Sequence, residues 1–222
     1  MKGKCHYTIS NSSEGWVKVE LGESGIGTVV LAKGKLLGGP ELYAIKALKK
    51  WGITSSNICE IMAEKEALML TSGHPLIKTL YSWLQNKDHI FFVIEFMSGG
   101  DLYEQLHEVE YFSEKWANFH IAKITLAIQF LYQHGISHQD LKFENVLMGS
   151  DRPCKIADFV LSKIGLFRNC KTSTQCGMPY CMAPEILKIL PFSQVVNWWA
   201  VGVMIFQMMT GHPPFYYGNE ED

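Results

Sequence analysis

The chain has 222 residues, enough for one or two domains that bury their own core without a disulfide or metal to stabilise them. Hydrophobic residues make up 47% and charged residues 19%, which excludes a disordered or fibrous chain. The net charge of −2 leaves no basic excess to neutralise phosphates, so nucleic acid is not expected as the main partner. Six cysteines without a CxxC pair or regular spacing indicate free thiols in a reducing compartment, not a disulfide framework or a zinc site.

No segment of the sequence is typical of a targeting signal or a membrane span. Residues 1–16 contain no apolar run that could serve as a signal peptide, and we expect them to form a leader. The longest apolar stretch, Trp198–Met209, is shorter than the ~20 residues that a bilayer requires. The sequence therefore predicts a cytoplasmic chain with no membrane-spanning segment.

Strand patterns dominate the chain up to residue 97. Alternating or continuous apolar residues bounded by turn residues predict strands over 17–21, 29–32, 42–48, 80–84 and 90–96. One helix is expected over 58–70, after Ser55-Ser56-Asn57 as a capping cluster. Its spacing predicts a common face formed by Ile58, Ile61, Met62, Lys65, Leu68 and Met69.

After Ser98-Gly99-Gly100 the pattern becomes helical. A long helix is predicted over 116–134, ending at Gly135, and an apolar helix begins near Asn197. The long helix should share one apolar face among Phe119, Ala122, Ile124, Leu126, Ala127, Phe130 and Leu131. We expect an α+β protein with two lobes, a small β-sheet lobe with one main helix at 17–97 and a mainly helical lobe at 98–222, with a ligand cleft between them.

A glycine-rich turn, Leu21-Gly22-Glu23-Ser24-Gly25-Ile26-Gly27-Thr28-Val29, joins the first two predicted strands. Glycines here let backbone N–H groups approach phosphate oxygens, although an ordinary hairpin would explain the turn taken alone. Further motifs follow in order: Tyr43-Ala44-Ile45-Lys46, Glu64, His138-Gln139-Asp140-Leu141-Lys142-Phe143-Glu144-Asn145, Asp158-Phe159-Val160 and Ala183-Pro184-Glu185. Singly, each charge could be a solvated side chain or a cap.

In this order the motifs resemble the protein kinases, from about Val17 to Pro214. Further details are similar to the protein kinase C branch, an AGC-type group, and to its protein kinase N relatives: Glu41–Lys46, Glu64–Leu68, Gly99–Leu102 and Asn197–Trp199. The resemblance implies a serine/threonine protein kinase that uses ATP and Mg²⁺ and acts on protein substrates. It also implies a preference for basic residues near the acceptor hydroxyl, read by Asp101 and Glu144.

The resemblance assigns the groups that handle phosphate. Lys46 would hold the α- and β-phosphates, and Glu64 would orient Lys46. Asp158 and Asn145 would ligate Mg²⁺, a cation that prefers oxygen donors. Asp140 would accept the proton of the substrate hydroxyl. Lys142 would balance charge beside the γ-phosphate. His138 is expected to be a packed core histidine.

The remaining ATP-binding residues are also implied by the resemblance. Val29, Ala44 and Leu147 would enclose the adenine, with Ile94 at the back wall and backbone groups of Glu95 and Met97 at the adenine edge. The glycine-rich turn would cover the phosphates through Leu21, Gly22, Glu23, Ser24, Gly25 and Gly27.

Several positions depart from the family pattern. Ser24 and Gly25 are exchanged, which predicts weaker nucleotide affinity, and Val160 replaces a glycine, which restricts the backbone beside Asp158. Gln139 replaces the arginine that meets the phosphorylated activation loop, whose threonine aligns with Thr174.

Further departures lie towards the end of the chain. Met178 replaces a threonine that contacts the catalytic aspartate in the family. Asn197 replaces an aspartate that anchors the catalytic loop. The sequence ends soon after the helix near Asn197, so we expect the last helices of the family and its C-terminal tail to be absent. Glu185 would then lose an arginine partner, and the apolar helix would expose a face for a protein partner.

Three interpretations remain open from the sequence. The first is an active kinase, because the residues that touch phosphate, metal and hydroxyl are all present. The second is a pseudokinase or interaction module, favoured by Ser24, Gln139, Val160 and Asn197. The third is a truncated product that folds poorly. Nucleotide binding with and without Mg²⁺ separates the first two, and cooperative melting would exclude the third.

Overall fold

The computed structural model describes residues 18–24, 27–33, 41–150, 154–167, 170–173 and 176–215. The chain divides into two compact units: the first unit is Met1–Cys59 with Lys78–Phe96, and the second unit is Glu60–Ile77 with Met97–Asp222. The lobe limits expected from the sequence, 17–97 and 98–222, stay predictions. Within the described ranges no helix combines the length and the apolar character needed to cross a membrane.

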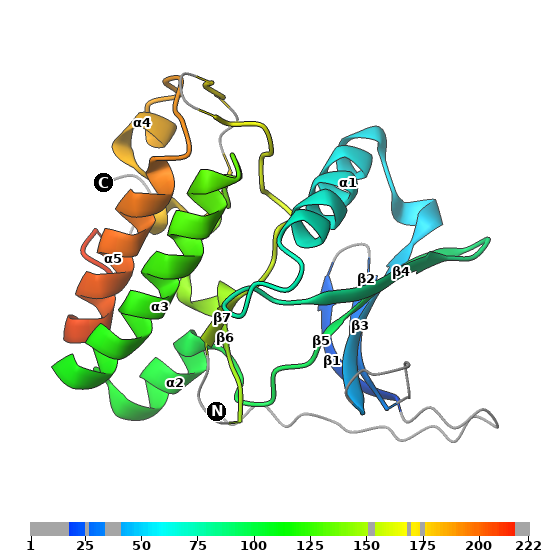
Figure 1. Cartoon of the computed structure of the whole chain (residues 1–222), viewed down its shortest axis with the longest axis horizontal. Helices are drawn as coiled ribbons and strands as arrows, with labels where there is room; N and C mark the ends of the chain where they lie inside the picture. The colour runs from blue at the N-terminus through cyan, green and yellow to red at the C-terminus, as the bar shows by residue number, and fades with distance from the viewer. Residues whose placement is uncertain are drawn as a thin grey trace. The chain divides into compact units, whose positions relative to one another are not determined.

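The first unit is built on one antiparallel sheet of five strands, in the order β1-β2-β3-β5-β4 (Figure 1). Its strands are β1 (Lys18–Ser24), β2 (Gly27–Lys33), β3 (Leu42–Lys49), β4 (Leu80–Gln85) and β5 (His89–Glu95). They occupy the predicted segments, with ends shifted by a few residues. A single 3-10 turn, Lys50–Gly52, follows β3. The alternation of apolar residues therefore predicted this sheet correctly.

The β1–β2 hairpin carries two features of the glycine-rich turn. The pairing shifts between Glu20 and Gly22, so the strand bulges there before closing at the pair Ser24↔Gly27. On the other side, Gly27 pairs with Leu48 of β3. A Cβ on Gly27 would lie 2.6 Å from the Ala47 carbonyl oxygen, so the sheet closes here only around glycine.

Helix α1 (Ser55–Leu70) confirms the predicted helix, but its start and its buried face differ from the prediction. Ser55 begins the helix, and the cap is Thr54, whose Oγ1 accepts a hydrogen bond from the Asn57 backbone N–H at 3.4 Å. The buried residues are Ile61, Glu64, Ala67 and Leu68, whereas Ile58, Met62 and Met69 are exposed. The predicted face was thus right at Ile61 and Leu68 and wrong at the exposed positions, because apolar side chains also occupy protein surfaces.

The second unit is mainly helical and holds one small sheet (Figure 1). Its helices are α2 (Leu102–Val109), α3 (Glu114–Gln133), α4 (Pro184–Leu187) and α5 (Val196–Thr210), and its short strands are β6 (Val146–Met148) and β7 (Cys154–Ile156). Short 3-10 turns occur at Phe143–Asn145 and Pro179–Cys181. The sequence predicted α3 and α5 but not α2, α4 or β6.

Helices α3 and α5 lie side by side and form the core of the second unit (Figure 1). Helix α3 ends at Gln133 with His134 as its C-cap, close to the predicted end, and buries Ile124, Ala127, Ile128 and Leu131. Phe119 and Leu126 were predicted on that face and are exposed instead. Helix α5 buries Val203, Met204 and Met208, and it leaves Trp198, Trp199, Ile205, Phe206 and Met209 partly exposed.

We predict that Gly27→Ala destabilises the fold, because the added methyl group meets the Ala47 carbonyl and the Leu48 side chain, both at 2.6 Å. Overpacking of this kind costs about 1–3 kcal/mol of unfolding free energy. In a chain of this size that lowers Tm by about 2–4 °C per kcal/mol, measured by circular dichroism. The matched control is Gly22→Ala, whose Cβ meets nothing within 4 Å. Equal Tm losses in the two variants would contradict the close approach at Gly27.

Candidate active site

In the first unit, one face of the sheet gathers the predicted nucleotide-binding side chains. Val29 pairs with Lys46, Lys46 with Phe92, and Ala44 with Ile94. Directly paired residues of antiparallel strands point to the same side of a sheet. Val29, Ala44, Lys46 and Ile94 therefore share one face, on which Lys46 is the charged member.

Other residues of the first unit occupy the ends of its strands. Leu21 is exposed in β1, while Gly25 and the side chains of Glu23 and Ser24 lie outside the described residues. At the end of β5, the Glu95 backbone N–H donates to the Thr79 carbonyl at 2.9 Å, and the Thr79 N–H donates to Glu95 Oε2 at 3.2 Å. These two hydrogen bonds fix the end of β5.

In the second unit, the loop 137–145 brings three predicted residues together around one carboxylate. Lys142 Nζ lies 3.2 Å from Asp140 Oδ2. The Asn145 side chain donates from Nδ2 to the same Oδ2 at 2.9 Å and to the Asp140 backbone carbonyl at 2.7 Å. The Asp140 side chain is 11% exposed and that of Lys142 is 19% exposed, so this ion pair is largely shielded from water.

His138 also fixes this loop through hydrogen bonds of its ring. Its Nε2 is 2.9 Å from the Ala157 carbonyl, and its Nδ1 accepts from the Asp140 N–H at 3.3 Å. This pair of contacts requires the neutral tautomer with the proton on Nε2. The ring is fully buried against Phe159, and burial lowers the pKa of His138. The expectation of a packed core histidine is confirmed.

Asp158 follows β7 at the point where β7 meets the loop. The Ala157 N–H donates to the Asn145 carbonyl at 2.8 Å, which joins the two predicted magnesium ligands through their neighbouring backbone. Asp158 is exposed and adopts φ 60°, a conformation uncommon for residues other than glycine. Its Oδ1 accepts from the Val160 N–H at 3.4 Å, and this turn presents the carboxylate to solvent.

The donor set at this position suits Mg²⁺ bound together with a phosphate group. Among the described residues, no group of three or more His, Cys, Asp or Glu side chains could hold a metal by itself. Mg²⁺ is commonly held by one or two protein oxygens, with substrate phosphates and waters as its other ligands. One carboxylate, from Asp158, and one amide oxygen, from Asn145, fit that pattern.

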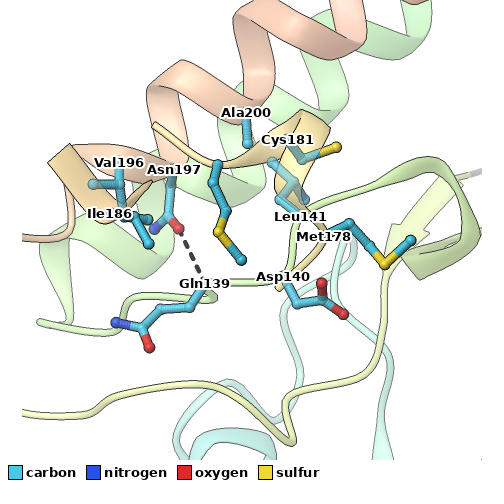
Figure 2. Close-up of a pocket in the computed structure, with 10 residues that line it drawn as sticks. Gln139, Asp140, Leu141, Met178, Cys181, Ile186, Val196, Asn197 and Ala200 are labelled. Carbon is cyan, nitrogen blue, oxygen red and sulfur yellow. Dashed lines mark hydrogen bonds between the residues drawn. The ribbon is translucent and has the colours of Figure 1, made fainter. Parts of the chain in front are cut away.

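Asn197 of α5 anchors the loop from the other side (Figure 2). Its Oδ1 accepts from the Gln139 N–H at 3.4 Å and from Ser137 Oγ at 3.5 Å. A cavity of about 10 Å³, roughly the space of one water molecule, lies beside it and is also lined by Met178. An amide thus retains the acceptor contact of an aspartate, without its charge.

The remaining predicted residues are distributed over the second unit. Glu64 is buried in α1, Met97 is half-buried, and Leu147 is half-buried in β6. Glu185 occupies the first turn of α4. Thr174 lies outside the described residues.

The sequence did not predict a larger pocket in the second unit, of about 620 Å³. Its lining includes Tyr103, Glu110, Glu144, Tyr180 and Gln207. Among these five residues, only Glu144 has a role that the sequence predicts. The pocket was not predicted because α2 was not predicted and because the lining residues come from segments distant in the sequence. Burial, with smaller contributions from the Glu104 and Glu144 carboxylates, raises the pKa of Asp101 at the start of α2.

Comparison with known proteins agrees with this fold. The family model described as "Protein kinase domain" matches residues 16–222. Protein kinase C of Drosophila melanogaster is 42% identical over 221 residues, covering 99% of this chain and 29% of the relative. Protein kinase C epsilon type of Oryctolagus cuniculus is 42% identical over 208 residues, covering 93% and 28%. Protein kinase C delta type of Homo sapiens is 41% identical over 203 residues, covering 91% and 30%.

The sheet unit and the helical unit with its loop 137–145 define a protein kinase domain, and the chain belongs to that family. Within the family it is an AGC-type domain that resembles protein kinase C. The chain spans about three tenths of the length of these relatives.

Stability should fall in mild acid because His138 is buried in its neutral form. Its pKa is lowered in the folded state, so the unfolded chain binds the proton more readily. The free energy of unfolding is therefore unaffected by this group above 6.5, the ordinary pKa of histidine. It decreases as the pH falls below that value, by up to about 1.4 kcal/mol per pH unit.

Urea unfolding at about pH 7.5 and pH 5.5 measures this loss. His138→Asn keeps an amide donor for Ala157 but does not titrate, so it should lose less stability between the two pH values. Burial also lowers the pKa of His74, but that group is common to both proteins and cancels in the comparison. An identical loss in the parent and in His138→Asn would refute the assignment.

Proposed function

We propose that this chain transfers the γ-phosphate of ATP to serine or threonine hydroxyls of protein substrates. The observation that carries the proposal is the single carboxylate of Asp140, held by Lys142 at 3.2 Å and by Asn145 at 2.9 Å. Such transfer depends on positioning and charge neutralisation more than on covalent chemistry. A shielded carboxylate beside a lysine supplies both.

Each residue of this loop has one role in the reaction. Asp140 orients the substrate hydroxyl and accepts its proton, while the bond from the hydroxyl oxygen to the γ-phosphorus forms and the bond from the γ-phosphorus to ADP breaks. Lys142 neutralises charge on the transferred group, and its contact with Asp140 keeps the two side chains in register. Asp158 and Asn145 hold Mg²⁺, which neutralises phosphate oxygens when bound.

The nucleotide-binding roles in the first unit belong to the same proposal. Lys46 contacts the α- and β-phosphates, with Glu64 orienting it, while Val29 and Ala44 contact the adenine. Their common sheet face supports the assignment of Val29, Ala44 and Lys46. Leu147, Glu95 and Met97 complete the adenine site, and Leu21 to Gly27 cover the phosphates.

The pocket of about 620 Å³ in the second unit supports a proposal for the substrate class. Glu144 Oε2 is buried and has no hydrogen-bond partner among the described residues. Asp101 at the start of α2 is a second carboxylate near Glu144; burial is the main cause that raises its pKa, and the Glu104 and Glu144 carboxylates contribute less. A cationic side chain entering between Tyr103 and Tyr180 would satisfy Glu144 and contact aromatic faces. We therefore propose substrates with basic residues near the acceptor.

The proposal also covers regulation and location, both of which rest on the sequence. Thr174 is the proposed activation-loop phosphosite, tested by mass spectrometry of the purified chain. The cytoplasmic location rests on the cysteine usage and is tested by cell fractionation. The partly exposed face of α5 at Trp198, Trp199 and Phe206 is a candidate surface for a protein partner.

The direct test is phosphate transfer by the purified chain to a serine peptide with basic neighbours. Asp140→Asn keeps the shape of the side chain but removes the proton acceptor, so kcat should fall by about 10²–10⁴ while ATP affinity is retained. Lys46→Met and Asp158→Ala should abolish turnover as well. Glu108→Gln, an exposed position of α2, is the control that keeps activity.

Activity that survives in Asp140→Asn and Asp158→Ala would belong to a contaminant or to another site. A parent chain that binds nucleotide but transfers no phosphate would favour the pseudokinase alternative. The neutral Gln139 and Asn197 and the β-branched Val160 are the features that favour this alternative.

Peptide preference should depend on Glu144. Glu144→Gln should raise KM by about tenfold to a hundredfold for a peptide with basic neighbours, since a hydrogen-bonded charge contact contributes about 1.5–3 kcal/mol. For a neutral peptide KM should stay the same. Glu108→Gln, which does not line the pocket, should leave both values unchanged. Equal KM changes for the two peptides would exclude Glu144 as the recognition residue.

A further inference from the structure

The segment Cys176–Met178 runs along the loop that carries Asp140. Cys176 Sγ lies 3.3 Å from Gln139 Oε1. Gly177 packs on the Gln139 backbone carbonyl. Met178 lines the small cavity together with Gln139 and Asp140 (Figure 2). Three consecutive residues therefore contact the loop within one residue of the catalytic carboxylate.

Gly177 makes this close approach possible. Its φ is 102°, and a Cβ there would lie 2.7 Å from the Gln139 carbonyl oxygen and 3.4 Å from Asp140 Oδ1. Backbone contact at such a distance leaves no room for a side chain. The position of the segment is thus tied to the position of Gln139.

Gln139 is itself held firmly. It adopts φ 66°, and its side chain is buried. Its backbone N–H donates to Asn197 Oδ1 at 3.4 Å, as Figure 2 shows. The Gln139 backbone contacts α5 and its side chain contacts Cys176. Gln139 can therefore couple the position of α5 to the position of the segment Cys176–Met178.

The contact between the two side chains is uncharged. Burial raises the pKa of the Cys176 thiol; Lys163 lowers it in part, and the Asp140 and Glu60 carboxylates raise it further, so the thiol keeps its proton and donates it. The Gln139 carbonyl oxygen accepts. A neutral donor and a neutral acceptor are screened little by salt, unlike an ion pair.

We propose that Gln139 is a positioning residue whose side-chain amide holds the Cys176 thiol and thereby sets the segment Cys176–Met178 beside Asp140. The catalytic consequence rests on the proposed kinase function, whereas the contact itself can be measured without any turnover. Gln139 acts here through Asp140 and does not touch the substrate.

The first experiment measures the rate at which iodoacetamide alkylates Cys176, read by mass spectrometry on the purified chain. Gln139→Met has a similar length but no acceptor, and it should raise this rate about threefold to tenfold, the range for losing one net hydrogen bond. Cys170 is an exposed thiol of the neighbouring stretch and serves as the internal control whose rate stays constant. An unchanged ratio of the two rates would overturn the proposal.

The second experiment keeps Gln139 and changes its partner, in case Gln139→Met does not fold. Cys176→Ala removes the donor and Cys176→Ser replaces it with a hydroxyl. Amide hydrogen exchange over 176–182 should be faster in the alanine variant and near the parent rate in the serine variant. Equal exchange in all three proteins would also overturn the proposal.

Kinetics separate positioning from a purely structural role. Cys176→Ala should lower kcat severalfold with little change in the KM for ATP, and Cys176→Ser should recover most of that loss at both low and high salt. A parent chain without turnover whose Cys176 still responds to Gln139→Met would refute the proposed function and support the contact. A change confined to KM would refute the positioning role.

Discussion

The site depends on one shared carboxylate. Asp140 accepts from Asn145 and pairs with Lys142, and both contacts lie in a loop that is largely shielded from water. A carboxylate in such surroundings needs its partners, because an unpaired buried charge is costly. The same contacts also set the rotamer of the group that would meet the substrate hydroxyl. Stability and chemistry therefore impose the same geometry on this loop.

Neutral groups hold that loop in place. His138 bridges the Ala157 carbonyl and the Asp140 N–H, Asn197 accepts from the Gln139 N–H, and Ser137 exchanges backbone hydrogen bonds with Lys163. The departure at position 197, which favoured a pseudokinase from the sequence, thus retains an acceptor contact while losing charge, whereas the neutral Gln139 side chain contacts the Cys176 thiol. A loop of this kind is positioned by directional hydrogen bonds, with less contribution from long-range electrostatics.

The sequence predicted the strands of the sheet well because each is a short apolar or alternating run bounded by turn residues. It predicted helix faces poorly: Ile58, Phe119 and Leu126 are exposed, although their spacing suggested burial. Motif order identified Asp140, Lys142 and Asn145, which the structure brings together. The contact between Gln139 and Cys176 could not be predicted, because the two residues are 37 positions apart in the sequence. It also depends on the positive φ of Gly177, which lets the two backbones approach each other. The pocket beside Glu144 was also missed, because its lining residues come from segments that are distant in the sequence.

The most direct test of the account is calorimetric titration of the purified chain with a non-hydrolysable ATP analogue, with and without Mg²⁺. If Asp158 and Asn145 hold the metal against the phosphates, Mg²⁺ should increase the affinity, and Asp158→Asn should remove most of that increase. The same affinity in the presence and absence of Mg²⁺, or an increase that persists in Asp158→Asn, would contradict the account.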